Sequence, residues 1–219
     1  LGCSADVWEP ALRCLAGQRL DHAVWAPDMA GHGHSSGPPE ALTIAELGDW
    51  AARLLDALAV NRAHVAAHSM GAQVALALAR RHPERIGGLV LVGPTTGGRH
   101  RVPPRYAAGL VADGLCEPVL YTRLLVRMYR EMGPRRYLAA ARRMIEDDPF
   151  AGIAQVTARC LVVRGQGDEV VPAAAARQLA AALPRGAYLE VSGARHVVQI
   201  DTAATFALVV AAFLAGIEV

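Results

Sequence analysis

The sequence predicts an α/β fold, in which a mostly parallel sheet is covered by helices on both faces. Two observations predict this class. Short apolar runs alternate with Ala-rich segments of helical spacing over most of the chain, and this alternation is typical of parallel strands joined by helices. The length of 219 residues also suits a single domain with a sizeable core.

The first elements are predicted from apolar spacing and from one capping motif. Apolar side chains at helical spacing predict a helix over residues 6–15. The short apolar run His22–Ala26 predicts a strand. Thr43 and Glu46 have the spacing of a capping box, which predicts a helix that ends near Leu58.

The later elements continue the alternation. Apolar runs predict strands at residues 63–67, 86–92, 160–163 and 188–191. Segments rich in alanine predict helices at residues 73–81, at residues 173–183 and after His196. Because helices separate these strands along the chain, the strands are expected to pair in parallel.

Residues 95–155 interrupt the alternation and are predicted to form a helical insertion without a strand. One of its helices places two kinds of side chain on different faces: Arg123, Arg127 and Arg130 on one, and Leu120, Leu124, Leu125, Met128 and Met132 on the other. This pattern favours a solvated charged face, although an anionic substrate would also suit the arginines. The core is then expected to comprise residues 1–94 and 156–219.

Composition argues against several classes of protein. The 22 basic residues, all arginine, nearly balance 20 acidic residues, so no general attraction to nucleic acid is expected. No apolar run reaches the roughly 20 residues that span a bilayer. The cysteines lack the spacing of a zinc site, which favours free thiols in a cytoplasmic protein; they are Cys3, Cys14, Cys116 and Cys160.

The most informative motif is Ala67-His68-Ser69-Met70-Gly71, in which a serine stands between a predicted strand and a predicted helix. A nucleophilic serine occupies such a strand-turn-helix elbow. It also needs a histidine base and an acid that orients this base. Asp168 and His196 each follow a predicted strand, and groups at the carboxyl ends of parallel strands lie together. The three side chains are therefore expected to meet.

Each assignment has a structural alternative. The serine could merely cap its helix, and Asp168 could be a turn residue with Glu169 as the rival acid. His196 is preferred among the histidines because it follows the last predicted strand. His32 and His34, in the Gly-rich segment after Pro27, are expected to hold that loop by hydrogen bonds.

With these residues in order, the chain resembles the α/β-hydrolase superfamily, whose triad runs serine, acid, histidine. The resemblance covers essentially the whole length. Besides the serine motif, similar positions are Pro27-Asp28, Gly31-His32-Gly33-His34-Ser35, Arg81-His82-Pro83-Glu84-Arg85 and Asp168 with Val171-Pro172. The resemblance implies that Ser69 attacks a carbonyl carbon, His196 transfers protons and Asp168 fixes the imidazole tautomer. An acyl-enzyme would form and water would cleave it, without a metal or cofactor.

The resemblance also implies an oxyanion hole and a cap. The Met70 N–H would be one donor. Leu1-Gly2 looks like the end of the His-Gly-x-Gly loop that many relatives carry, so Leu1 would supply the second N–H. The insertion at residues 95–155 corresponds to the helical cap that relatives place over the nucleophile, where it supplies much of the acyl pocket.

A further expectation concerns the sheet. Relatives have three strands before the position of residue 1, and one of these lies between the strands predicted at residues 22–26 and 63–67. Unpaired backbone groups in an interior cost about 1–3 kcal/mol each, and over a whole strand this exceeds the usual stability of a domain. The chain is therefore expected to be part of a longer hydrolase.

The expected activity is that of a serine hydrolase of the carboxylesterase type, which cleaves an ester, thioester or lactone of a small, largely apolar acyl group. A carbon–carbon bond hydrolase acting on a diketone, a perhydrolase and an acyltransferase share the triad and stay open. A non-catalytic binding module, or an inactive fragment, is the alternative of another class. The expected partner is a small-molecule substrate, with no nucleic acid or membrane.

Overall fold

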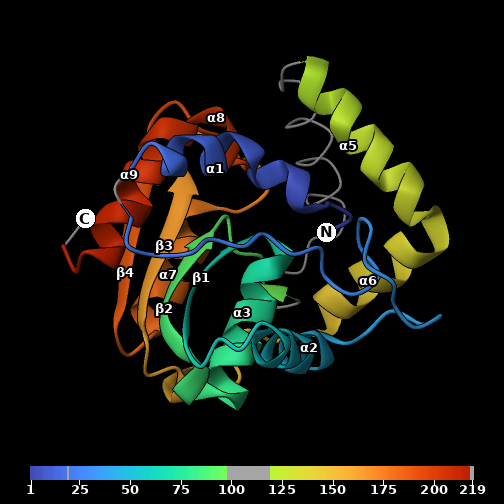
Figure 1. Ribbon diagram of the computed structural model, residues 1–219, viewed down its shortest axis with the longest axis horizontal. Coiled ribbons are helices and arrows are strands. Elements are labelled where there is room, and N and C mark those ends of the chain that lie inside the picture. Colours follow the sequence, from blue (N-terminus) through green and yellow to red (C-terminus); the bar gives the residue numbers. More distant parts are fainter. Residues whose placement is uncertain (19, 98–118, 218–219) are drawn as a thin grey trace.

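The computed structural model describes residues 1–18, 20–97 and 119–217, the side chains of residues 119–122 excepted. Its centre is a sheet of four strands in the order β1-β2-β3-β4, and each neighbouring pair is parallel (Figure 1). The strands are β1 Ala63–His68, β2 Ile86–Val92, β3 Arg159–Gly165 and β4 Gly186–Val191. The predicted α/β class is confirmed, and so are the four strands predicted from residue 63 onward.

Helices surround this sheet. The α-helices are α1 Glu9–Ala16, α2 Ile44–Ala57, α3 Met70–Arg81, α5 Val119–Met132, α6 Pro134–Glu146, α7 Ala173–Ala182, α8 Val198–Asp201 and α9 Ala203–Leu214. Short 3-10 helices occupy Ala5–Trp8, Pro83–Arg85 and Ile153–Gln155. Helix α2 begins with the predicted capping box, because the Thr43 hydroxyl accepts from the Glu46 N–H and the Glu46 carboxylate accepts from the Thr43 N–H.

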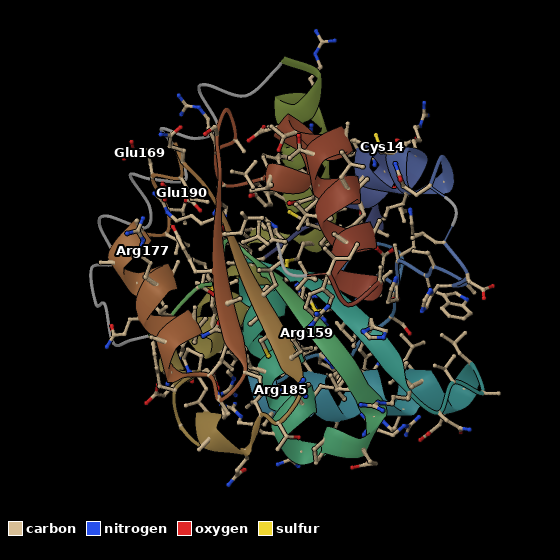
Figure 2. All side chains as sticks on the ribbon, turned by 90° about the vertical axis from the view of Figure 1, so that its left-hand side faces the viewer. Cys14, Arg159, Glu169, Arg177, Arg185 and Glu190 are labelled. Carbon is tan, nitrogen blue, oxygen red and sulfur yellow. The ribbon has the colours of Figure 1, made fainter. Side chains whose placement is uncertain are left out.

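The central strands are buried because alternate side chains enter two separate cores. Leu89 and Leu91 of β2 pack with residues of α3 and α7, whereas Val90 and Val92 pack with residues of α1 and α9. None of these four side chains is more than 3% exposed. Figure 2 shows α7 and α1 on opposite sides of the sheet. A strand covered on both faces needs such a continuous apolar run.

The segment predicted as a strand at His22–Ala26 is irregular, so this prediction is wrong. Val24 and Trp25 in it are 50% and 54% exposed. A cavity of about 810 Å³ is lined by both this segment and β1, and no β-ladder joins them. An apolar run becomes a strand only where a neighbour pairs with its backbone. Within the described ranges, β1 is consequently an edge of the sheet.

Two helices of the predicted insertion, α5 and α6, lie against the rest of the chain; residues 98–118 of that predicted segment lie outside the described residues. Met128 of α5 is buried with Val7 and Val197, and α6 is linked to α3 because Gln73 Nε2 donates to the Met144 carbonyl at 3.1 Å. The predicted charged face of α5 is exposed: Arg123, Arg127 and Arg130. The side chain of Leu120, predicted on the apolar face, lies outside the described residues.

The carboxylate of Asp28 organises the Gly-rich loop at residues 28–37. Its Oδ1 accepts from the Ala5 N–H at 2.6 Å, and its Oδ2 accepts from the His34 N–H at 2.8 Å. These two bonds tie the N-terminal segment to the loop. His32 is buried in the same loop, with Nδ1 3.2 Å from the Ala30 carbonyl. This bond within the loop agrees with the structural role expected for His32.

Stability is expected to fall on acidification because His32 is buried. Burial lowers the pKa of its imidazole from 6.5 to about 4. Between these two values the unfolded chain binds a proton that the folded chain does not, so stability is fully present above pH 6.5 and is lost as the pH falls toward 4. At about 1.4 kcal/mol per pH unit, the loss from pH 7.5 to pH 5 is about 2 kcal/mol.

Urea unfolding of His32→Phe at pH 7.5 and pH 5 tests this expectation. The variant loses its Nδ1 hydrogen bond at both pH values but no longer titrates, so its free energy of unfolding should fall by about 2 kcal/mol less than that of the parent. His34→Phe, a change of an exposed histidine, is the control and should retain the full pH dependence. An equal pH dependence in all three proteins would contradict the expectation.

Three of the cysteines are free thiols: Cys3, Cys14 and Cys160. Burial raises the pKa of Cys160 to about 12, so this thiol stays protonated at neutral pH. Cys116 lies outside the described residues. In residues 1–18, 20–97 and 119–217, no helix combines the length and apolar character that a bilayer span requires.

Candidate active site

Ser69 occupies a strained turn between β1 and α3. Its backbone has φ 56° and ψ −120°, a region that a residue with a side chain adopts at a cost of about 1–3 kcal/mol. The Ser69 N–H donates to the Val92 carbonyl at 2.9 Å, which anchors the turn to the end of β2. Ala67 stands where the usual elbow motif has its first glycine. The methyl group of Ala67 does not crowd the turn at Gly71, because even a Cβ added to Gly71 would lie 3.9 Å from that methyl group.

The structure brings Ser69, His196 and Asp168 together at the carboxyl ends of β1, β4 and β3. His196 Nε2 lies 3.1 Å from Ser69 Oγ, and His196 Nδ1 lies 3.0 Å from Asp168 Oδ2. The three residues are 4–7% exposed. Because a carboxylate only accepts, the proton resides on Nδ1, and Nε2 is left to accept from the serine hydroxyl.

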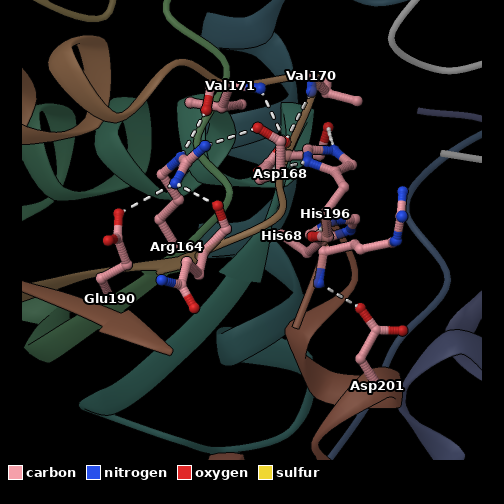
Figure 3. A network of polar contacts seen from close by, with 11 residues as sticks. His68, Arg164, Asp168, Val170, Val171, Glu190, His196 and Asp201 are labelled. Carbon is pink, nitrogen blue, oxygen red and sulfur yellow. Dashed lines mark hydrogen bonds and ion pairs between the residues drawn. The ribbon is translucent and has the colours of Figure 1, made fainter. Parts of the chain in front are cut away.

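The second oxygen of Asp168 is held by the backbone of its own loop. Asp168 Oδ1 accepts from the N–H groups of Val170 and Val171, each at 2.8 Å (Figure 3). Both carboxylate oxygens therefore have defined partners, and Oδ2 is directed at the imidazole. Glu169, the rival acid in the sequence, is exposed instead.

Two residues that sequence reasoning did not assign hold the loop of His196. His68 Nε2 lies 3.0 Å from the His196 carbonyl, and the two imidazole rings are 4.7 Å apart. Burial and the His196 ring keep the pKa of His68 well below 6.5, so its ring is neutral. Asp201 of α8 accepts from the Arg195 N–H at 2.6 Å. The only feature of the sequence that indicated these contacts was the position of His68 next to Ser69.

The two residues expected to form an oxyanion hole lie in one apolar cluster. Met70 is the first residue of α3, so its N–H belongs to the amides at a helix start that have no acceptor within the helix. Leu1 packs against the cluster that contains the Met70 side chain.

Gly93, directly after β2, gives the imidazole room to reach the serine. Its φ is +47°, and a Cβ there would lie 2.9 Å from His196 Nδ1 and 3.0 Å from its Cε1. Such contacts are shorter than those between real side chains and would push the ring away. The glycine is therefore a steric requirement of the arrangement.

Gly93→Ala is expected to lower kcat/KM about 100-fold, because a small displacement of a reacting group has an effect of this size. Steady-state kinetics measures the loss. The matched control is Gly216→Ala, whose φ is +77° and whose Cβ would meet nothing within 4 Å. It carries similar backbone strain without the clash and should retain activity within about twofold. Equal losses in both variants would contradict the steric explanation.

A parallel sheet with a histidine and an acid aligned behind a strained serine defines the chain as a hydrolase of the alpha/beta class. The chain belongs to the alpha/beta hydrolase fold family, whose model matches residues 1–114. It is 34% identical over 217 residues to the 2-hydroxymuconate semialdehyde hydrolase of Pseudomonas sp. (strain CF600), an alignment that covers 88% of this chain and 76% of that protein.

Solved structures are similar over nearly the whole chain. The enol-lactonase from Burkholderia xenovorans LB400 aligns with a TM-score of 0.79 and 26% identity, covering 98% of this chain and 88% of the lactonase. The N-acyl homoserine lactone degrading enzyme Est816 aligns with a TM-score of 0.81 over 97% of this chain and 90% of that one. At 23% identity, the second likeness concerns the fold alone. The relatives support hydrolytic activity.

Proposed function

We propose that this protein is a serine hydrolase that cleaves an ester, thioester or lactone through an acyl-enzyme. The observation that carries the proposal is the continuous line of contacts from Asp168 Oδ2 through His196 to Ser69 Oγ. This line supplies a nucleophile, a general base and an orienting acid in the geometry that acyl transfer requires. The enol-lactonase with a similar fold supports a substrate with an acyl–oxygen bond.

The reaction follows from the proton positions. Ser69 Oγ bonds to the carbonyl carbon while its proton passes to His196 Nε2, and Asp168 stabilises the imidazolium. The bond from the acyl carbon to the leaving oxygen, or to the leaving sulfur of a thioester, then breaks as Nε2 returns the proton to that atom. Water repeats both steps, so the bond from Ser69 Oγ to the acyl carbon breaks and an acid is released. The N–H groups of Met70 and Leu1 are proposed to bind the developing oxyanion.

We propose an uncharged, largely apolar acyl group rather than an anionic one, because the arginines near Met70 already have partners. Met70 lines a small hollow of about 10 Å³, which has room for about one water molecule, together with Leu42, Met132 and Ala140. It also contains two arginines, but Arg136 donates to the Pro38 carbonyl and Arg143 lies 3.2 Å from the Glu146 carboxylate. Both guanidinium groups thus have acceptors of their own, which supports a structural role for these charges.

Reaction with a fluorophosphonate probe tests the proposal. The probe phosphonylates an activated serine, so mass spectrometry should find one adduct, on the peptide that contains Ser69. Heat-denatured protein is the control and should not react. Folded protein that the probe leaves unmodified would favour a non-catalytic binding module on the same fold.

Carbon–carbon bond hydrolysis is the second candidate, and the 34% identity to a 2-hydroxymuconate semialdehyde hydrolase favours it. Parallel assays with p-nitrophenyl butyrate and with 2-hydroxymuconate semialdehyde separate the two. Turnover of the ester or of small lactones supports the leading proposal. Turnover of the semialdehyde with negligible ester hydrolysis would replace it.

A further inference from the structure

Arg164 is a buried cation beneath the loop that carries Asp168. It belongs to β3, and its side chain is 8% exposed. Its Nε donates to the Val171 carbonyl at 2.7 Å, its Nη2 to the Asp168 carbonyl at 2.6 Å and its Nη1 to the Gln166 carbonyl at 3.3 Å. A single guanidinium group therefore contacts three carbonyl groups of one loop, as Figure 3 shows in part.

The same loop uses its N–H groups to hold the Asp168 carboxylate. Val170 and Val171 donate to Asp168 Oδ1, while the carbonyl of Val171 accepts from Arg164. Asp168 itself is bound at both ends, because its carbonyl accepts from Arg164 and its Oδ2 faces His196. Movement of the guanidinium would consequently turn the loop and redirect the carboxylate.

The positive charge is balanced on the neighbouring strand. Arg164 is in register with Glu190 of β4, and its Nη1 lies 3.0 Å from Glu190 Oε2. Tyr188 donates to the same oxygen at 2.7 Å. A buried cation is tolerated when it is paired and hydrogen-bonded in this way. The guanidinium group places its donors on three separate nitrogen atoms in a fixed plane, whereas lysine has all of its donors on one nitrogen and cannot reach these acceptors together.

From these contacts we propose that Arg164 is a positioning residue, which sets the direction of the Asp168 carboxylate and through it the tautomer and orientation of His196. The proposal rests on the proposed serine hydrolase function. Arg164 lies behind Asp168 and acts on the reaction only through that residue. Its contribution should therefore vanish when Asp168 can no longer orient the imidazole.

A double-mutant cycle tests this dependence, with Arg164→Lys, Asp168→Asn and the combination measured on p-nitrophenyl butyrate. In the parent background Arg164→Lys should lower kcat about 30-fold with KM changed less than about 3-fold, because alignment is lost and binding is retained. In the Asp168→Asn background the same change should lower kcat less than about 3-fold. Arg13→Lys, an exposed arginine paired with Glu9, is the control and should leave kcat unchanged.

The outcomes separate the role of Arg164 from the function itself. Equal losses from Arg164→Lys in both backgrounds, or none in the parent background, would overturn the positioning role alone. An Asp168→Asn variant as active as the parent would overturn the proposed function as well. If circular dichroism shows that Arg164→Lys does not fold, Arg164→Gln replaces it in the cycle with the same expected dependence on Asp168. Failure of both variants to fold would assign Arg164 a purely structural role.

Discussion

Ser69→Ala is expected to lower the kcat of p-nitrophenyl butyrate hydrolysis by about 10⁴- to 10⁶-fold, because removal of the nucleophile from a serine hydrolase has an effect of this order. The variant should also fail to react with a fluorophosphonate. The fold should persist, because Ser69 Oγ makes its hydrogen bond to His196 and an alanine methyl group fills nearly the same space. Steady-state kinetics and labelling measure the two losses.

Ser36→Ala is the matched control, since Ser36 is an exposed serine of the Gly-rich loop. It should retain activity within about twofold and react with the probe as the parent does. A Ser69→Ala variant with more than about a tenth of the parent activity would place the nucleophile elsewhere. Thermal unfolding of both variants, monitored by circular dichroism, distinguishes lost chemistry from lost structure.

Asp168→Asn is expected to lower kcat about 10⁴-fold, the effect of the equivalent change in a serine protease triad. The cause follows from the two backbone amides at Asp168 Oδ1. They would bind the asparagine oxygen, so the asparagine NH₂ would face His196 Nδ1. Nδ1 would then have to accept, the ring proton would move to Nε2, and Nε2 could no longer take the proton of Ser69.

Glu169→Gln provides the control for the second prediction. Glu169 is the adjacent carboxylate and is exposed (Figure 2), so its neutralisation should change kcat less than about threefold. The tautomer can be observed directly, because ¹⁵N NMR of labelled histidine distinguishes a proton on Nδ1 from one on Nε2. An Asp168→Asn variant that keeps the proton on Nδ1 would contradict the explanation.

Strands β2 and β3 could be predicted because they are buried on both faces, which leaves a continuous apolar run in the sequence. Strands β1 and β4 are only partly buried, and shorter apolar runs indicated them. The run His22–Ala26 is also largely apolar, but none of the described strands pairs with it. A run becomes a strand only where the backbone of a neighbouring strand pairs with its own. The order of serine, acid and histidine was visible in the sequence since each follows an apolar run.

The residues that support this order were harder to predict. Arg164 interrupts an apolar run, so it indicated the end of a strand at Val163, although β3 extends to Gly165. The role of Arg164 depends on its hydrogen bonds to three carbonyl groups. The direction of these carbonyl groups cannot be predicted from the spacing of residues in the sequence. His68 was noticed only as a neighbour of the serine, because its contact with the His196 carbonyl joins residues 128 positions apart.

The wide separation of the reacting groups along the chain has a consequence for folding. Ser69 and His196 are 127 positions apart, and they meet only when β1 and β4 have both taken their places beside β2 and β3. Contacts of such long range form late and slowly, because the loop between them must be closed first. During refolding, helical circular dichroism should therefore recover before esterase activity, and the appearance of activity should mark the moment at which the whole sheet is assembled.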